Sequence, residues 1–224
     1  MGAFFITATG TDIGKTFVAA GLIRHLRATG REVDAIKPVM SGYDPSHAAN
    51  SDAGALLLAL DRTPTPHAVE AISPWRYRAP LSPDMAAAQE NKQLDVDALI
   101  AHSHEAIAEA QGTLLIEGVG GIMVPLDARR TVLDWMIALN APIILVAGSY
   151  LGTISHTLTA LDVLNRAKLD VRAVVVNESA ASTVTLEDTA AALARFTDNV
   201  IAVPRLSTTA GIHPAFAEIA ARLT

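Results

Sequence analysis

Six short apolar runs, separated by segments with a helical pattern, constrain the fold of this chain more than any other feature. Short runs of Val, Ile and Leu are typical of strands buried on both faces of a parallel sheet. Strands that alternate with helices predict an α/β fold of three layers, with a mostly parallel central sheet and helices on both faces. The runs are Phe4–Thr9, Val33–Lys37, Leu114–Glu117, Pro142–Gly148, Arg172–Asn177 and Val200–Pro204.

The segments between the runs carry apolar residues at helical spacing. One apolar stripe follows Asp95, a good N-cap residue, and another begins at Ile154. Thr131 and Asp134 have the spacing of a capping box. The stretch from Asp61 to Pro83 contains five prolines, and we expect an irregular functional loop there rather than a domain boundary. Residues 1–224 are therefore predicted to form a single domain.

Composition excludes several classes of function. The net charge is −6 and no basic cluster occurs, so there is no electrostatic case for binding nucleic acid or an anionic membrane. The chain has no cysteine, which excludes disulfides, thiolate metal sites and a cysteine nucleophile. The N-terminus lacks the charged region of a signal peptide, and no apolar run approaches the roughly 20 residues that span a bilayer. We expect a cytoplasmic protein.

Gly14, Lys15 and Thr16 lie between the first predicted strand and a helix, as in a phosphate-binding P-loop. In that reading Lys15 reaches the β- and γ-phosphates of a nucleotide and Thr16 binds Mg²⁺. The common pattern would place a further glycine at position 9, where this chain has Thr9. The alternative is a chance Gly-Lys-Thr in a turn, which the flanking strand and helix disfavour.

Polar residues follow several of the predicted strands. Lys37, Glu117 and Asn177 each end a run, and ligands of open α/β sheets bind beyond the carboxyl ends of the strands. Glu117 suits the Mg²⁺ side of such a site, or it is a surface acid. Lys37 is a second cation beside the phosphates, or a surface lysine with a buried stem. Asp52 is a metal ligand or part of a helix N-cap, and these residues alone leave both readings open.

Seven stretches, in order along nearly the whole chain, resemble the dethiobiotin synthetase family. They are TGTDIGKT (9–16), KPVMSG (37–42), NSDA (50–53), PLSPDMAAAQE (80–90), EGVGG (117–121), LGTISHTLTALDVL (151–164) and VVVN (174–177).

The resemblance implies a homodimeric enzyme of the P-loop NTPase fold that works in biotin biosynthesis. Its substrates are 7,8-diaminononanoate, CO₂ and ATP, and Mg²⁺ is its cofactor. One amine of the substrate forms a carbamate with CO₂, and ATP phosphorylates the carbamate. The second amine then closes the ring and expels phosphate, so that the products are dethiobiotin, ADP and phosphate.

The resemblance also assigns roles to the nucleotide and metal residues. It implies that Thr11, Lys15 and Lys37 are catalytic, and that Thr16, Asp52 and Glu117 surround Mg²⁺. The implied ATP-binding residues are Asp12, Ile13, Gly14, Lys15, Thr16, Asp52, Glu117, Gly118, Val119, Gly120, Asn177, Pro204, Arg205 and Leu206. Asn177 would read the adenine edge.

The implied substrate residues fall into two groups. Thr11, Lys37, Ser41, Ser82 and Pro83 would contact the reacting end and the chain of the diamine. The helix start at Gly152, Thr153, Ile154 and Ser155 would hold its carboxylate from the partner subunit, although the family often has Asn where this chain has Ser155. The first glycine of the family's loop falls on Ala8, and we expect Gly10 to supply the flexibility instead.

Two other classes share parts of this pattern. Amide ligases related to the cobyrinic acid a,c-diamide synthases commonly carry a fused glutaminase with a cysteine nucleophile, and the absence of cysteine excludes that arrangement. Regulatory ATPases of the partition type usually have an additional lysine early in the loop. Residues 7–14 contain none, which disfavours this class.

Overall fold

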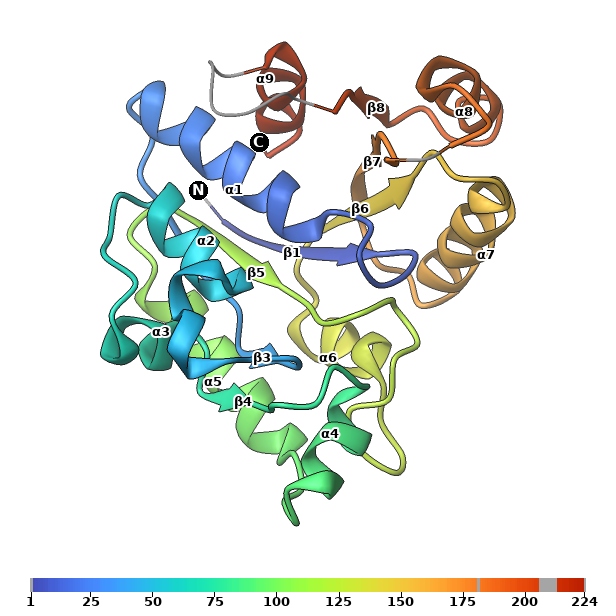
Figure 1. Cartoon of the computed structure of the whole chain (residues 1–224). Helices are drawn as coiled ribbons and strands as arrows, with labels where there is room; N and C mark the ends of the chain where they lie inside the picture. The colour runs from blue at the N-terminus through green and yellow to red at the C-terminus, as the bar shows by residue number, and fades with distance from the viewer. Residues whose placement is uncertain (1, 181, 206–212, 224) are drawn as a thin grey trace.

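A six-stranded parallel sheet forms the centre of the protein (Figure 1). The computed structural model describes residues 2–180, 182–205 and 213–223. The strand order is β2-β5-β1-β6-β7-β8, and every neighbouring pair is parallel. All six predicted runs are strands of this sheet: β1 (Ala3–Ala8), β2 (Val33–Ile36), β5 (Thr113–Glu117), β6 (Ile143–Gly148), β7 (Val171–Asn177) and β8 (Val200–Val203).

Helices cover both faces of the sheet, as the alternating pattern predicts. In Figure 1, α1 and α9 lie on one face, and α5 and α6 lie on the other. The helices are α1 (Lys15–Ala28), α2 (Asp52–Ala59), α3 (Pro66–Ile72), α4 (Pro83–Gln89), α5 (Val96–Glu109), α6 (Val132–Leu139), α7 (Thr153–Arg166), α8 (Leu186–Leu193) and α9 (Pro214–Ala221), with a 3₁₀ helix, η1, at Pro45–Asn50.

The predicted helix caps are present. Asp95 accepts a hydrogen bond from the backbone N–H of Ala98 at the start of α5. Thr131 and Asp134 form the capping box of α6. These side chains satisfy N–H groups that a helix leaves unpaired in its first turn, so they fix where each helix begins.

The expectation of an irregular loop from Asp61 to Pro83 is wrong in part. This stretch contains α3 and the strand β4 (Trp75–Arg76), which pairs in parallel with β3 (Val39–Met40) to form a second, two-stranded sheet. Prolines occupy the first turns of α3 and α4, where their missing N–H costs no hydrogen bond. The second sheet brings the segment after β4 beside the one after β3, since Gly42 N–H donates to the carbonyl oxygen of Ala79 at 3.0 Å.

The core is largely aliphatic, with one aromatic contact at its centre. Phe5 of β1 packs edge-to-face on Trp135 of α6, with ring centroids 4.8 Å apart, and both side chains are fully buried. The indole N–H of Trp135 donates to Ser103 Oγ on α5 at 3.1 Å, so the buried polar atom has a partner. This contact joins the central strand to both helices of one face.

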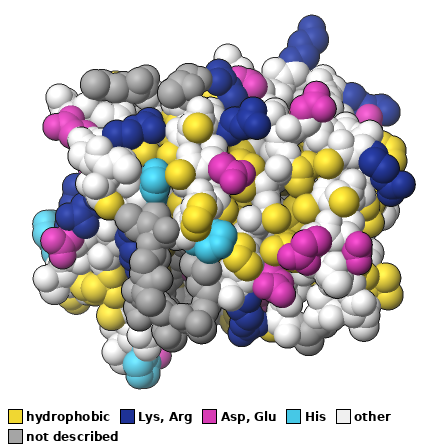
Figure 2. All heavy atoms as spheres, turned by 90° about the horizontal axis from the view of Figure 1, so that it is seen from above, with side chains coloured by type: hydrophobic (Ala, Val, Ile, Leu, Met, Phe, Trp, Pro, Cys, Tyr) yellow, Lys and Arg dark blue, Asp and Glu magenta, His cyan; other side chains and the backbone are white. Residues whose placement is uncertain are grey.

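The surface shows charges of both signs. On the face that Figure 2 presents, Lys and Arg side chains are interspersed with Asp and Glu, and no broad basic patch forms among the residues drawn in colour. Within the described part of the chain, none of the helices has the length and apolar character to cross a membrane.

Candidate active site

A cavity of about 640 Å³ opens at the carboxyl ends of the strands, between the loop after β1 and the segments after β3 and β4. Twelve of the residues predicted for the site line it. They are Thr11, Asp12, Gly14, Lys15, Thr16, Lys37, Ser41, Asp52, Ser82, Pro83, Val119 and Gly120. Four lining residues were not predicted: Met40, Pro80, Leu81 and Val124. Met40, Pro80 and Leu81 lie inside stretches that carry the family resemblance, and Val124 follows one of them by three residues.

Two residues of the loop between β1 and α1 adopt the left-handed region of the backbone. Asp12 and Gly14 have positive φ angles of 56° and 100°. Gly10 belongs to the bent segment of this loop and is not among the residues with positive φ, so it bends there without the backbone conformation that favours glycine. Ala8 belongs to β1 and pairs with Val146 of β6, where an extended backbone needs no glycine.

Lys37 is almost fully enclosed, with 2% of its surface exposed. Its Nζ lies 2.8 Å from Glu117 Oε1 and 3.3 Å from Asp52 Oδ2, and it donates to the carbonyl oxygen of Gly118 at 2.6 Å. An ammonium has three N–H groups, and these contacts account for all of them. Lys37 is therefore no solvated surface lysine, and its charge is paired inside the site.

Glu117 carries its hydrogen bonds on one oxygen only. Oε1 accepts from Lys37 and also from the Thr16 hydroxyl at 2.7 Å. Oε2 is buried and has no hydrogen-bond partner among the described residues. A buried carboxylate oxygen without a partner is costly, and such atoms frequently mark a place where a ligand or ion binds.

Lys15, at the start of α1, is paired much less closely. Its Nζ is 3.4 Å from the carbonyl oxygen of Gly10, and 8% of its surface is exposed. Burial and the neighbouring charge of Lys37 lower the pKa of Lys15 from its ordinary value to about 8. This amine thus faces the cavity as a cation that lacks a close anionic partner, which suits it to bind an anion.

The pKa values of Lys37 and Asp52 are shifted in the directions that ion pairing produces. Burial alone would lower the pKa of Lys37, but Glu117 and Asp52 outweigh it and raise this pKa. Burial alone would raise the pKa of Asp52, but the charge and hydrogen bond of Lys37, the hydrogen bond of Thr16 and the charge of Lys15 together outweigh it and lower this pKa. Both groups are therefore charged at neutral pH.

The residues present fit a magnesium ion. The Thr16 hydroxyl, Asp52 and Glu117 are oxygen donors, which Mg²⁺ prefers, and Glu117 offers the buried Oε2 that lacks a partner. No cluster of three or more His, Cys, Asp or Glu side chains occurs in residues 2–180, 182–205 and 213–223. Such an ion would therefore take its remaining ligands from phosphate and water, as is usual for Mg²⁺.

The loop after β5 approaches the phosphate-binding loop closely. A Cβ on Gly121 would lie 3.4 Å from the carbonyl oxygen of Ala8, and one on Gly118 would lie 2.8 Å from the ring of Phe5. Gly120 has a φ of 59°, which places it in the left-handed region. A side chain at Gly118 or Gly120 would therefore displace its neighbours, whereas the contact at Gly121 is an ordinary van der Waals distance.

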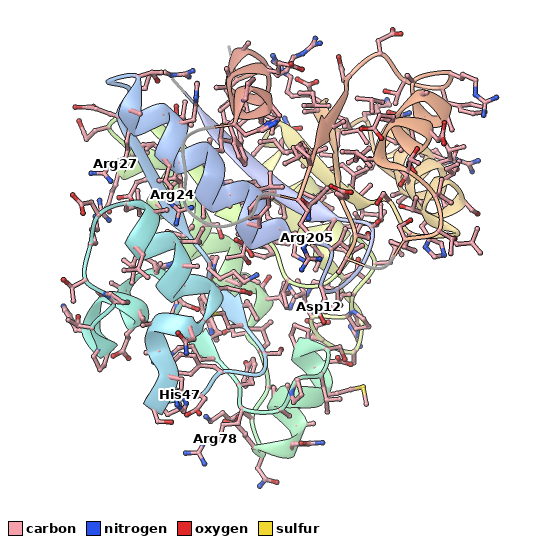
Figure 3. The ribbon with its side chains drawn as sticks, turned by 45° about the horizontal axis from the view of Figure 1, so that its top comes forward. Asp12, Arg24, Arg27, His47, Arg78 and Arg205 are labelled. Carbon is pink, nitrogen blue, oxygen red and sulfur yellow. The ribbon has the colours of Figure 1, made fainter. Side chains whose placement is uncertain are left out.

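Asn177 connects the end of β7 to the phosphate-binding loop. Its Nδ2 donates to the carbonyl oxygen of Ile13 at 2.9 Å. Beside it, Glu178 Oε2 accepts from the backbone N–H of Arg205 at 2.8 Å, next to the half-buried Pro204. In the view of Figure 3, the labelled Asp12 and Arg205 lie near each other at the middle of the molecule. Leu206, which was predicted to bind ATP, lies outside the described residues.

The start of α7 is a separate surface. Gly152 caps the helix with a φ of 97°, and Thr153 is buried with its hydroxyl donating to the carbonyl oxygen of Gly148 at 2.8 Å. Neither they nor Ile154 and Ser155 line the cavity of this chain. Leu151, just before the helix, is 79% exposed, which is unusual for a large apolar side chain.

Comparisons with known proteins agree with this geometry. A family model described as an AAA domain matches residues 2–211. The ATP-dependent dethiobiotin synthetase of Caulobacter sp. strain K31 is 53% identical over 199 residues, which cover 88% of this chain and 85% of the relative. That of Acidiphilium cryptum is 50% identical over 196 residues, covering 87% and 88%.

Solved structures show the same fold at low identity. The cell division ATPase MinD of Pyrococcus furiosus superposes with a TM-score of 0.57 and 16% identity, over 100% of this chain and 98% of that one. A ParA family ATPase of Chlorobium tepidum gives 0.53 and 15%, over 90% and 84%. At this identity the likeness establishes a P-loop NTPase fold and carries no activity with it.

Proposed function

The chain belongs to the ATP-dependent dethiobiotin synthetases, ligases of biotin biosynthesis, and from this premise we propose how its own residues divide the work. The reaction joins CO₂ to 7,8-diaminononanoate with hydrolysis of ATP to ADP and phosphate. One observation carries the assignment of roles: two lysines and two carboxylates from four separate segments converge where the cavity meets the phosphate-binding loop.

Binding and orientation are the main tasks of the protein. The carbamate formed from one amine and CO₂ is an anion, and its attack on the γ-phosphate of ATP brings two anions together. Lys15 and Lys37 would offset this charge, and the backbone N–H groups at the start of α1 would hold the phosphates. No general base is required, since the carbamate is already a nucleophile and needs only alignment with the phosphate.

Ser41 and Thr11 are placed to position the reacting end of the substrate. Both line the cavity, and Ser41 Oγ is buried without a hydrogen-bond partner among the described residues. A hydroxyl in this state can donate to a carbamate oxygen or accept from an amine. The chain of the substrate would lie along Ser82 and Pro83 in the same cavity.

Magnesium would be held by Thr16, Asp52 and Glu117. When bound, the ion neutralises charge on the phosphates of ATP. The Nδ2 of Asn177 already donates to the Ile13 carbonyl, so its Oδ1 would accept a hydrogen bond from the amino group of adenine. Val119 and Gly120, with Pro204 and Arg205, would border the nucleotide.

We also propose that residues 1–224 act as one domain in a homodimer, in the cytoplasm. The start of α7 would then reach the partner's cavity and bind the carboxylate of the diamine with its N–H groups. Two observations support this: these residues do not line their own cavity, and the large apolar side chains Leu151 and Met123 are 79% and 55% exposed.

Incorporation of labelled CO₂ tests the proposed function. Purified protein is incubated with ¹⁴C-bicarbonate, 7,8-diaminononanoate and Mg-ATP, and acid-stable label in dethiobiotin is measured together with ADP. We expect one labelled product per ADP formed. Folded protein that binds ATP but produces no acid-stable label would contradict the assignment.

A further inference from the structure

The contacts of Lys37 in the structure conflict with its proposed role in the reaction. In the structure its ammonium occupies the space between the two carboxylates that would bind a metal, at 2.8 Å from Glu117 and 3.3 Å from Asp52. In the reaction, its charge is needed on the cavity side, beside the phosphate and carbamate. All three N–H groups are engaged, so Lys37 cannot serve an anion in the cavity without leaving these partners.

We propose that Lys37 is the resident cation of the Asp52–Glu117 pair in the nucleotide-free protein, and that a divalent cation displaces it and turns its ammonium toward the reacting anions. Lys37 would thus compete with the metal for the same carboxylates. The inference takes Asp52 and Glu117 as metal ligands from the proposed function, and otherwise depends on contacts of this chain alone.

The charges around the pair explain why the two cations exclude each other. Lys15 and Lys37 offset the charges of Asp52 and Glu117, so a divalent cation added beside Lys37 meets only the one further negative charge of Asp12, which interacts with Lys15. It would also lie next to a buried ammonium, where repulsion between charges is strong because little water screens it. Removing Lys37 adds one net negative charge to the site and vacates the space.

Glu117 shows how the exchange can begin. Lys37 and Thr16 both contact Oε1, and Oε2 has no partner among the described residues. A metal that arrives with nucleotide can therefore bind Oε2 first, before Lys37 leaves Oε1. The side chain of Asp52 is 49% exposed, so few packed neighbours would hinder it from moving away from Lys37. Lys37 therefore becomes free to bind the reacting anions only when metal is present, which is after Mg-ATP has bound.

Binding of Mn²⁺ alone, measured by electron paramagnetic resonance without nucleotide or substrate, tests this competition. We expect Lys37→Met to bind Mn²⁺ at least about tenfold more tightly than the unaltered protein, which is about 1.4 kcal/mol. The matched control is Lys15→Met, which removes the same charge from the same cavity but does not free a carboxylate oxygen for the metal. It should tighten binding by no more than about threefold, since within the described part of the chain the Nζ of Lys15 donates to the Gly10 carbonyl and makes no close ion pair with Asp52 or Glu117.

Three results would overturn the inference. In the first, Lys37→Met binds Mn²⁺ no more tightly than the unaltered protein. In the second, Lys15→Met tightens Mn²⁺ binding as much as Lys37→Met does. In the third, Lys37 of the unaltered protein stays protected from acetylation when Mn²⁺ is bound. Protection is measured by acetylation and mass spectrometry, with the exposed Lys92 as internal reference. If Lys37→Met does not fold, Lys37→Gln, which keeps an N–H donor for Gly118, replaces it under the same criteria. These readouts do not involve product, so they remain valid if the labelled-CO₂ assay fails.

Discussion

Asn177, at the end of β7, donates a hydrogen bond of 2.9 Å to the carbonyl oxygen of Ile13, and this bond attaches the phosphate-binding loop to a strand two positions away in the sheet. The contact leaves no room beside the next residue of the loop. A Cβ on Gly14 would lie 2.2 Å from Asn177 Nδ2, where nothing can fit without displacing the amide.

Gly14→Ala is therefore expected to weaken ATP binding by at least about tenfold, because it combines a clash with a φ of 100° that alanine disfavours. The control is Gly30→Ala, which has a φ of 74° and no atom within 4 Å of its Cβ. Both changes carry the backbone cost of a side chain in the left-handed region, about 1 to 2 kcal/mol in stability. Calorimetric titration with ATP should show loss of affinity only for Gly14→Ala, and equal affinity for both variants would contradict the role of Asn177.

Lys37→Ala should reduce turnover far more than nucleotide affinity. In the proposed role its charge acts where negative charge accumulates during phosphoryl transfer, and removing such a group costs about 100- to 1000-fold in kcat. The dissociation constant for ADP in the absence of Mg²⁺ should change by less than about threefold, since Lys37 is paired with carboxylates in the structure. Equal losses in kcat and affinity would mean that Lys37 is only a nucleotide ligand.

Much of this site was predictable because parallel strands all end at one edge of the sheet. Lys37, Glu117 and Asn177 each follow an apolar run, and the structure places them at that edge. The direct ion pair between Lys37 and Glu117 was not predictable. It exists because β2 and β5 are neighbours, and the order of strands in the sheet differs from their order in the sequence.

The segment from Asp61 to Pro83 was predicted poorly for a different reason. Its prolines suggest irregular structure when they are only counted, but Pro66 and Pro83 occupy helix first turns, where proline is well tolerated. The strands β3 and β4 have two residues each, too few to show any alternation of side chains. Such elements depend on each other for stability, and no local pattern specifies them.

Lys15 should make the stability of the nucleotide-free protein depend on pH. Its pKa is about 8 in the folded state and 10.5 by the ordinary value, so the unfolded chain binds more protons between these two values. Stability therefore rises as pH increases from about 8 to about 10.5, and the penalty from Lys15 is fully present below pH 8. The shift corresponds to about 3 kcal/mol.

Lys15→Met removes this titration. We expect the variant to be more stable than the unaltered protein at pH 7, by about 1 to 3 kcal/mol, and the difference to shrink toward pH 10. Urea unfolding at pH 7, 8.5 and 10 measures it. The exposed Lys92, changed to Met, is the control for the loss of a lysine as such, and a constant difference across the three pH values would show that Lys15 does not titrate in this range.

Mixed dimers test whether the start of α7 completes the partner's site. Ser155→Glu puts an acid in the first turn of α7, where it stabilises the helix but repels a substrate carboxylate. Its KM for the diamine should rise by at least about tenfold, with kcat nearly unchanged. Lys37→Ala impairs the other part of the site. In a dimer of one chain of each kind, one of the two sites would have both Lys37 and Ser155.

Random mixing of the two variants then gives half of the dimers one intact site, so that a subsaturating assay recovers about a quarter of the normal activity. Neither variant alone should approach this value. The assay is run after brief unfolding and joint refolding, with Ser155→Ala in place of Ser155→Glu as control. If α7 serves the cavity of its own chain, the mixture shows only the average of the two variants, and sedimentation then distinguishes a monomer from a dimer with unshared sites.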